Sequence, residues 1–486
     1  MPRVVQLPDF TSKTLRTFPQ TDKSLLNLDD GMPSITLGDT QGSALRMLYI
    51  LTLAGVLQPT EKQYNFLRNL CEKSRKYVYE DFDNFAKELA HIPVNSDIFV
   101  RFIGDTLADR GKHDFLTLLI YEHLVNKRVY FEIILSNHDV EFICAMEGSA
   151  AERSKISDNH FVLGQEYLDF ANSLENLRKD ARRIKELAPR AHEIYDKCLI
   201  ERFKMISYEK DGGRYVIFTH APITPDIIQK LECQLTNKYK LTPLSVDTLP
   251  HIVESINNAL QELLQEKKFS VFYSLHSTGK AHVYNAIEYV LYNRVINAEN
   301  FDFEMLKSVP MIFVHGHTGP IGAEIVRPDN EELIKSSFYN LDTSYAGAEC
   351  DVPDGTLRIY LGNLDETLIE KLKKRDSDPL RSEKEVPSFT LKEFFGEESS
   401  QSRPKGEKHP EEEFSEEESS GEISVSDFLD VLPVGKGSSQ NRSFSLFPCK
   451  GEKHPEEELS EEESSGEISV SDFLDEFPQG VPKPTP

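Results

Sequence analysis

Residues 98–111 read IFVRFIGDTLADRG, an apolar run that ends abruptly at a Gly-Asp pair. The run has the length and the branched and aromatic residues of a buried strand, and the polar residues after it indicate a loop. This loop contains residues of types able to bind metal or phosphate, among them Asp105, Asp109 and Arg110. A Gly-Asp pair after a strand is by itself usually a simple turn, so its interpretation depends on the rest of the chain.

Five further apolar runs end in the same way, at residues able to bind metal or phosphate. They end at GDTQG (38–42), SNHD (136–139), THAP (219–222), HGHTG (315–319) and DT (342–343). Helical periodicity fills the intervals, for example over residues 43–57 and 251–268. Alternating strands and helices predict an α/β domain, in which the loops at strand ends converge. These loops are therefore expected to share a site although they are far apart in the chain.

The composition argues against several classes of protein. A formal net charge of −26 disfavours general binding to nucleic acid, because such a surface repels phosphate. The six cysteines are scattered and form no Cys-x-x-Cys pair, which argues against a disulfide scaffold or a thiolate zinc site and fits a reducing compartment. No apolar run approaches the roughly 18 residues that a membrane span needs, and residues 1–10 lack the pattern of a signal peptide. We therefore expect no membrane span and no conventional export signal.

The acidic charge is concentrated in the last part of the chain. Residues 376–486 contain 28 acidic and 11 basic residues and are rich in Glu, Ser, Pro and Gly. Such a segment is expected to be disordered, because it cannot bury enough apolar surface to offset its conformational entropy. Within it, residues 405–430 are repeated at 450–475 with one difference, Phe414 against Leu459. Either the tail is a solvated spacer, or the apolar residues after each glutamate block form a docking or address motif.

The ordered set of loops (Gly-Asp, Gly-Asp to Asp-Arg-Gly, Asn-His-Asp, His, Gly-His) resembles the calcineurin-like metallophosphatases, and within them the phosphoprotein phosphatase family. The resemblance extends from Ile35 to Gly362. It implies a sandwich of two mixed sheets flanked by helices, with two divalent metal ions at the sheet edges. Two such ions can lower the pKa of a shared water and clamp phosphoryl oxygens during in-line attack. A ligand set that mixes oxygen and imidazole favours manganese, with iron or zinc as alternatives, over calcium.

The resemblance also implies a role for individual residues. The implied metal ligands are Asp39 and Gln41 for the first ion, Asp105 as the bridge, and Asn137, His220 and His317 for the second ion. The implied catalytic residues are His138, Asp109 and Arg110. His138 would be the general acid that protonates the leaving oxygen, and Asp109 would hold its orientation. Arg110 would bind the phosphate in a bidentate way that a lysine cannot reproduce.

Three features depart from the family pattern. Gln41 stands where the family has a histidine, and because an amide oxygen is a poorer ligand for transition metals, the first ion is expected to bind weakly. Asp105 and Asp109 are four positions apart where three is usual, so their loop must bulge. Ser136 replaces a common glycine, which is a mild change. Two further polar residues at strand ends are assigned no metal, His315 and Asp342.

The expected domain organisation follows from the same resemblance. A metallophosphatase domain would occupy residues 1–375, and the acidic tail would occupy residues 376–486. The intervals between motifs are long, so helical insertions are expected at 58–97, 140–212 and 223–308. These insertions are either peripheral decoration or a helical cap that shapes the substrate groove. We favour the cap, because loops at strand ends surround such a site.

Within the family, the stretches Ser-Asn-His-Asp and Asp-Thr-Leu-Ala-Asp-Arg-Gly are similar to the Wip-type phosphatase effectors of Legionella. The glutamate blocks at 412–416 and 457–461 resemble the signal of type IV secretion substrates. We therefore expect a metal-dependent protein phosphatase that is cytoplasmic in the producing bacterium and is then secreted into a host cell, where it acts on phosphoproteins. Its tail would contact the secretion machinery. Two alternatives remain open, a dinucleoside polyphosphate hydrolase of the same superfamily and a pseudophosphatase that acts as a binding module.

Overall fold

The computed structural model describes most of the chain before residue 371. The described residues are 3–7, 12–21, 32–73, 77–148, 177, 179, 184, 187–272, 285–297, 306, 308–318, 324–326, 337–342, 357–364 and 368–370. The acidic tail, with its expected disorder and its duplicated segment, lies outside the described residues. No helix in the described part of the chain is both long and apolar enough to cross a membrane.

A six-stranded mixed sheet carries the first three motifs. Its strands, in spatial order, are β1 (Arg3–Leu7), β12 (Leu357–Leu364), β2 (Met32–Leu37), β3 (Phe99–Phe102), β4 (Phe131–Ile134) and β5 (Phe203–Lys204). The strands from β2 to β5 run parallel, whereas β12 pairs antiparallel with both β1 and β2. Parallel strands covered on both faces need continuous apolar runs, and β3 is buried along its whole length.

A four-stranded mixed sheet carries the two histidine motifs. Its order is β11 (Phe338–Asn340), β9 (Met311–His315), β7 (Arg214–Phe218) and β6 (Ser207–Asp211). The first three strands are parallel, and β6 pairs antiparallel with β7. A separate parallel pair joins β8 (Val295–Asn297) to β10 (Glu324–Val326). Both main sheets thus have their parallel strands next to one another, which aligns the ends that bear the motifs.

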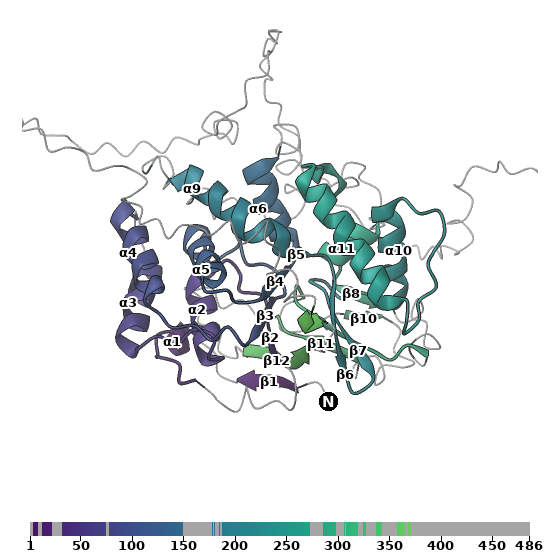
Figure 1. Cartoon of the computed structure of the whole chain (residues 1–486), viewed down its shortest axis with the longest axis horizontal. Coiled ribbons are helices and arrows are strands. Elements are labelled where there is room, and N and C mark those ends of the chain that lie inside the picture. The colour runs from purple at the N-terminus through teal and green to yellow at the C-terminus, as the bar shows by residue number, and fades with distance from the viewer. Residues whose placement is uncertain are drawn as a thin grey trace, which may run out of the picture. The chain divides into compact units, whose positions relative to one another are not determined.

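The two main sheets pack face to face around a small apolar core. This core contains Ile103 and Ile134 from the end of β3 and from β4, together with Val216 and Phe218 from β7. Arg101 crosses the same interface, where its guanidinium contacts Glu132 and Glu209 and lies 3.8 Å from the centre of the Phe218 ring. The predicted sandwich of two mixed sheets flanked by helices is therefore confirmed (Figure 1).

Helices cover the sandwich on its outer sides (Figure 1). Those next to the six-stranded sheet are α1 (Ser12–Leu15), α2 (Ala44–Leu53), α3 (Glu61–Cys71), α4 (Tyr79–Ala90), α5 (Asp114–Asn126), α6 (Asn137–Glu147) and α9 (Leu187–Ile194). Those that follow β7 are α10 (Pro225–Thr236), α11 (Leu249–Gln265) and α12 (Ala286–Tyr292). Every residue of α2 is buried, which accounts for its almost wholly apolar sequence.

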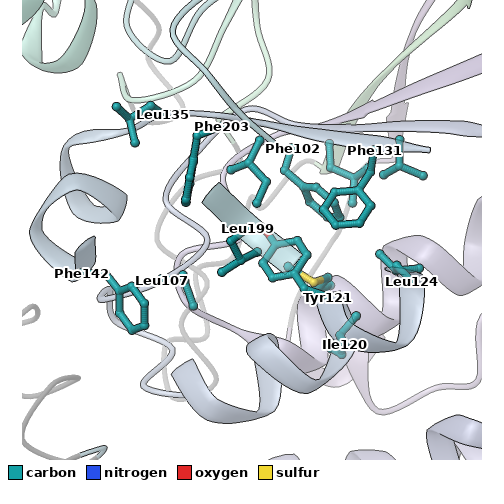
Figure 2. Close-up of a cluster of buried hydrophobic side chains, with 14 of the residues drawn as sticks. Phe102, Leu107, Ile120, Tyr121, Leu124, Phe131, Leu135, Phe142, Leu199 and Phe203 are labelled. Carbon is teal, nitrogen blue, oxygen red and sulfur yellow. The ribbon is translucent and has the colours of Figure 1, made fainter. Parts of the chain in front are cut away.

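An aromatic cluster fixes α5 against the strands that carry the central motifs (Figure 2). The ring of Tyr121 on α5 meets Phe102 edge-on at 5.1 Å and stacks on Phe131 at 5.5 Å. The same cluster includes Leu107, in the loop after β3, and Phe142, on α6. The motif loops are thus anchored from beneath by close-packed side chains, which limits their movement.

The structure differs from the expected helical character of residues 140–212. Short helices are present there, namely α9, a π-helical turn η2 (Tyr195–Leu199) and a 3₁₀ turn η3 (Ile200–Arg202), but so are the strands β5 and β6. These strands are hard to see in the sequence, because β5 has two residues and β6 reads SYEKD. Both lie at a sheet edge, where charged residues are tolerated. The other two segments hold α3 and α4, and α10, α11, η4 (Phe269–Phe272), α12 and β8.

Candidate metal centre and active site

The motif loops meet where the parallel strands of both sheets end. Asp39 and Gln41 follow β2, Asp105 follows β3, and Asn137 begins α6 after β4. His220 and His317 follow β7 and β9 in the other sheet. All six side chains that were expected to bind metal are buried. Because the strands are parallel and adjacent, their carboxyl ends bring these side chains together.

The side chains expected at the second metal position converge on His220. Its Nε2 lies 3.0 Å from Asn137 Oδ1, 3.1 Å from His317 Nδ1 and 3.4 Å from Asp105 Oδ1. The opposite ring nitrogen, Nδ1, donates to the carbonyl of Ile103 at 3.0 Å. This backbone contact makes Nε2 the nitrogen with a free lone pair, which is the form that binds a metal ion. Ligand atoms of Asp105, His220 and His317 lie within 4.8 Å of one another.

Burial keeps both histidines neutral. It lowers the pKa of His220 to about 3, and it lowers the pKa of His317 well below the usual value, with the neighbouring His220 as a further cause. Burial raises the pKa of the Asp105 carboxyl to about 6 and that of Asp39 well above its usual value. Neutral imidazoles beside buried carboxylates fit a cation, whose charge would favour the ionised acids.

The first metal position is defined by buried oxygen atoms that have no donor. Asp39 Oδ1, Gln41 Oε1 and Asp105 Oδ1 are buried and have no hydrogen-bond partner within the described ranges. The second oxygen of Asp39 accepts a hydrogen bond of 2.8 Å from the backbone nitrogen of His317. A buried oxygen without a partner costs free energy, and a bound cation would remove that cost. The donor set therefore fits a divalent ion that prefers oxygen, such as manganese.

Two of the motif glycines are needed because a side chain at either position would collide with a site residue. A Cβ on Gly316 would lie 2.0 Å from Asp39 Oδ1, and a Cβ on Gly104 would lie 2.5 Å from His220 Nδ1. Three expected ligands also have left-handed backbones, with φ of 53° at Gln41, 48° at Asp105 and 65° at His317. Such conformations are unfavourable for residues other than glycine, and they concentrate where function requires a fixed geometry.

The expected general acid, His138, is buried beside the metal positions. Its Nδ1 donates to the carbonyl of Ala108 at 3.0 Å, and its Nε2 lies 3.9 Å from Asp109 Oδ1. Ala108, in the loop that is one residue longer than usual, has a left-handed φ of 52°. Its carbonyl orients the imidazole, which leaves Nε2 directed toward Asp109. A third carboxylate, Glu141, lies 3.7 Å from Nδ1.

Arg110 differs from the other expected site residues because part of it reaches solvent. Its side chain is 22% exposed, whereas the Asp109 side chain is fully buried. The guanidinium Nε lies 3.2 Å from Asp109 Oδ1, and the Arg110 backbone nitrogen donates to the same oxygen at 2.7 Å. The arginine is therefore held at its base by Asp109. Of the catalytic trio it is the residue that an entering phosphate could reach first.

Sequence reasoning underestimated Ser136 and missed Asp139. The hydroxyl of Ser136 caps α6 by accepting from the Asp139 backbone nitrogen at 3.0 Å, and it also accepts from the Asp105 backbone nitrogen at 2.9 Å. Asp139 Oδ1 accepts from the backbone nitrogens of Thr106 and Leu107, at 3.2 Å each. This pair therefore holds the loop that bears Asp105. The Ser-x-x-Asp spacing of a capping box was the available signal.

Two more buried residues border the first metal position, Arg46 and Asp342. Arg46 lies on α2, is 1% exposed, and donates from Nη1 to the backbone carbonyl of Asp39 at 3.2 Å. Asp342 follows β11, and its Oδ1 lies 3.5 Å from Gln41 Nε2. Arg46 sits in an apolar helix and carries no recognisable motif. His315 is buried as well, but it donates to the Gly316 carbonyl and belongs to neither metal-binding group.

Comparisons with known proteins find a similar solved structure and a matching family model. The phosphatase domain of the Legionella effector WipB is a similar solved structure, with 20% identity, coverage of 58% of this chain and 99% of that chain, and a TM-score of 0.48. A search of curated proteins finds no match. The sequence model described as "WipA-like, phosphatase domain" matches residues 99–341, which is half of this chain. The matched range includes, among the expected site residues, Asp105, Asn137, His138, His220 and His317. It begins after Gln41. The chain therefore belongs to the family of WipA-like phosphatase domains.

Proposed function

We propose that the chain is a phosphoprotein phosphatase that uses two divalent metal ions to hydrolyse phosphate monoesters. The observation that carries the proposal is the convergence of Asn137, Asp105 and His317 on one nitrogen of His220, beside the unpartnered oxygens of Asp39 and Gln41. The second ion would be held by His220 and the three residues around its Nε2, and one of these, Asp105, would also serve the first ion. The oxygen-rich set of the first position favours manganese, with iron or zinc as alternatives.

Two cations held there would activate a water for in-line attack and neutralise charge on the phosphoryl oxygens. The remaining steps belong to the side chains of the chain itself. Arg110, at the exposed edge of the site, binds two oxygens of the phosphate and orients the ester. In its imidazolium form His138 donates the Nε2 proton to the leaving oxygen, while its Nδ1–H stays bonded to the Ala108 carbonyl and Asp109 lies beside Nε2. No covalent enzyme intermediate is required.

The site is also proposed to act inside a host cell. The similar WipB domain comes from a protein described as a Legionella effector, and we carry that setting over to this chain. The two glutamate blocks of the tail would then address the chain to a type IV secretion system. The long helical segments around the strand ends would form a cap that admits a phosphorylated side chain. Host phosphoproteins are therefore the proposed substrates.

A phosphatase assay of the full-length chain tests this proposal. A panel of phosphotyrosine, phosphoserine and phosphothreonine peptides, together with a dinucleoside polyphosphate, would be incubated with and without added Mn²⁺. We expect Mn²⁺-dependent release of phosphate from peptides and a loss of turnover with a chelator. Faster cleavage of the dinucleotide would instead favour the polyphosphate hydrolase. Bound metal without turnover of any compound would favour the pseudophosphatase.

A further inference from the structure

The amide of Gln41 is held between the first metal position and Asp342. Its backbone lies in a left-handed turn that is joined to the next motif loop, because the Gln41 carbonyl accepts from the Gly111 backbone nitrogen at 2.7 Å. The neighbouring Gly42 backbone nitrogen donates to the Asp105 carbonyl at 3.0 Å. The loop that carries Asp105 therefore fixes the backbone position from which the Gln41 side chain extends.

Chemistry decides which end of this amide faces which neighbour. Nε2 of Gln41 is directed to Asp342 Oδ1 at 3.5 Å, a long contact but one between a donor and an acceptor. The flipped amide would place its oxygen against the Asp342 carboxylate, which is repulsive. The observed orientation leaves Oε1 on the other side of the amide, buried and without a donor among the described residues. An oxygen in that state is available to a cation.

The buried Arg46 is a positive charge that interacts with the negative charges of Asp342 and Asp39. Its guanidinium is buried, and the carboxylates whose charges favour its protonated form are Asp342 first and Asp39 second. Burial lowers the pKa of Arg46 to about 10, so the group remains a cation at neutral pH. The acceptor at the Gln41 contact is thus one of the acids whose charges act on a buried arginine.

We propose that Asp342 is a positioning residue for the first metal position: it orients the Gln41 amide so that Oε1 serves as the ligand. An amide that donates to a carboxylate has a more electron-rich oxygen, so this contact partly replaces the imidazole that Gln41 lacks. The inference rests on the proposed dimetal function. It assigns no metal to Asp342 itself.

Binding of Mn²⁺ to the full-length chain tests the assignment without reliance on activity. Isothermal titration would give the two affinities, and electron paramagnetic resonance would distinguish a coupled ion pair from an isolated ion. We expect Asp342→Asn to weaken the second, weaker binding event by roughly 10- to 100-fold and to remove the coupled signal at a Mn²⁺ level that saturates the wild type. The tighter event should be unchanged. Asp83→Asn, which removes a carboxylate paired with Lys87 on α4, is the matched control and should alter neither event.

A double-mutant cycle separates positioning from direct ligation. Because Asp342 acts through Gln41, Asp342→Asn should have no further effect on Mn²⁺ affinity in a Gln41→Ala background. Additive losses would show that Asp342 binds the ion itself and would overturn the assignment. An Asp342→Asn variant with unchanged affinities and an unchanged signal would overturn it too. Thermal unfolding of each variant without metal checks that the fold is retained.

An exchange of donor and acceptor extends the test to a variant that gains binding. In the double variant Gln41→Glu with Asp342→Asn, the amide at position 342 can donate to the carboxylate at position 41. The double variant should therefore bind the weaker ion more tightly than the single variant Gln41→Glu. Equal or weaker binding would contradict the assignment. Failure of the proposed function gives a different result. If the chain has no dimetal site, the His317→Asn variant should bind as much Mn²⁺ as the wild type, whatever residue stands at position 342.

Discussion

The individual side chains of the site are fixed by the backbone of other loops more than by one another. The Ile103 carbonyl selects the nitrogen that His220 presents, and the Ala108 carbonyl does the same for His138. Asp39 is held through the backbone nitrogen of His317. Backbone partners move little when a neighbouring side chain changes, so substitutions at this site should alter chemistry before they alter geometry.

His138→Asn should lower turnover by roughly two to four orders of magnitude, because it removes the proton donor for the leaving oxygen. An asparagine keeps a polar group that the Ala108 carbonyl can contact, so bound Mn²⁺ should remain. Turnover of a phosphopeptide and metal content by mass spectrometry check the two statements. Turnover equal to that of the wild type would remove His138 from the catalytic trio.

Gln41→His should lower the Mn²⁺ concentration that gives half-maximal activity. An imidazole is a better ligand for this ion than an amide oxygen, and its other nitrogen could donate to Asp342 as Gln41 does. A Mn²⁺ titration of activity measures the change, with Gln41→Ala as the comparison. If both variants keep the wild-type Mn²⁺ dependence, then Gln41 is not a ligand.

The elements of the fold show what a sequence can and cannot reveal. Loops at the ends of apolar strands were predictable, because strand length and the Gly-Asp and Asn-His-Asp signals are local. Ser136 was undervalued because its second partner, the Asp105 backbone nitrogen, comes from another loop. Arg46 was not recognised, and Asp342 was noted only as a strand-end residue without a metal, because the effect of its charge on Arg46 depends on the fold. The short edge strands β5 and β6 carry too little apolar signal to be read from the chain.

The cap of α6 is predicted to link stability to catalysis. Ser136→Ala should cost about 1 kcal/mol, within a range of about 0.5–2 kcal/mol, because the first turn of the helix loses its acceptor. It should also lower turnover, since Asp105 loses its backbone anchor. Thr60→Ala removes the cap of α3 and is the matched control. It should cost a similar free energy of unfolding and leave turnover intact, and equal effects of both variants on turnover would refute the link.

On the scale of the whole molecule, buried histidines should make the metal-free protein sensitive to acid. Burial, with the positive charge of Lys127 as a second cause, lowers the pKa of His123 on α5 to about 4. Above about pH 6.5 the side chain is neutral in both states and contributes nothing. As the pH falls from there toward 4, the unfolded chain binds the proton first, so the free energy of unfolding decreases.

The His123→Gln variant isolates this contribution. Denaturant unfolding at pH 7.5 and pH 5, in the presence of a chelator, should show a smaller loss of stability for the variant than for the wild type. The difference should be at most roughly 2 kcal/mol, because pH 5 lies only about 1.5 units below the unfolded pKa of about 6.5. Equal losses for the two proteins would mean that His123 is protonated in the folded state at pH 5.

Deletion of residues 376–486 should separate catalysis from delivery. The site and both sheets lie before residue 371, so the truncated chain should keep its unfolding temperature and its phosphatase activity. Delivery into a host cell, followed with a reporter fusion, should be lost, because both glutamate blocks are removed. A truncated protein that precipitates or loses turnover would show instead that the tail packs on the body.

The place of β12 between β1 and β2 determines the order in which the enzyme can be assembled. Residues 357–364 pair with residues 32–37, the strand that leads into Asp39, and with β1 at the start of the chain. During synthesis, β2 therefore waits with one edge unpaired until more than 300 later residues have been made, since Leu37 pairs with Ile359. The same delay applies to a chain that refolds from the unfolded state. The loop that bears Asp39 therefore gains its full support only when β12 has docked on β2.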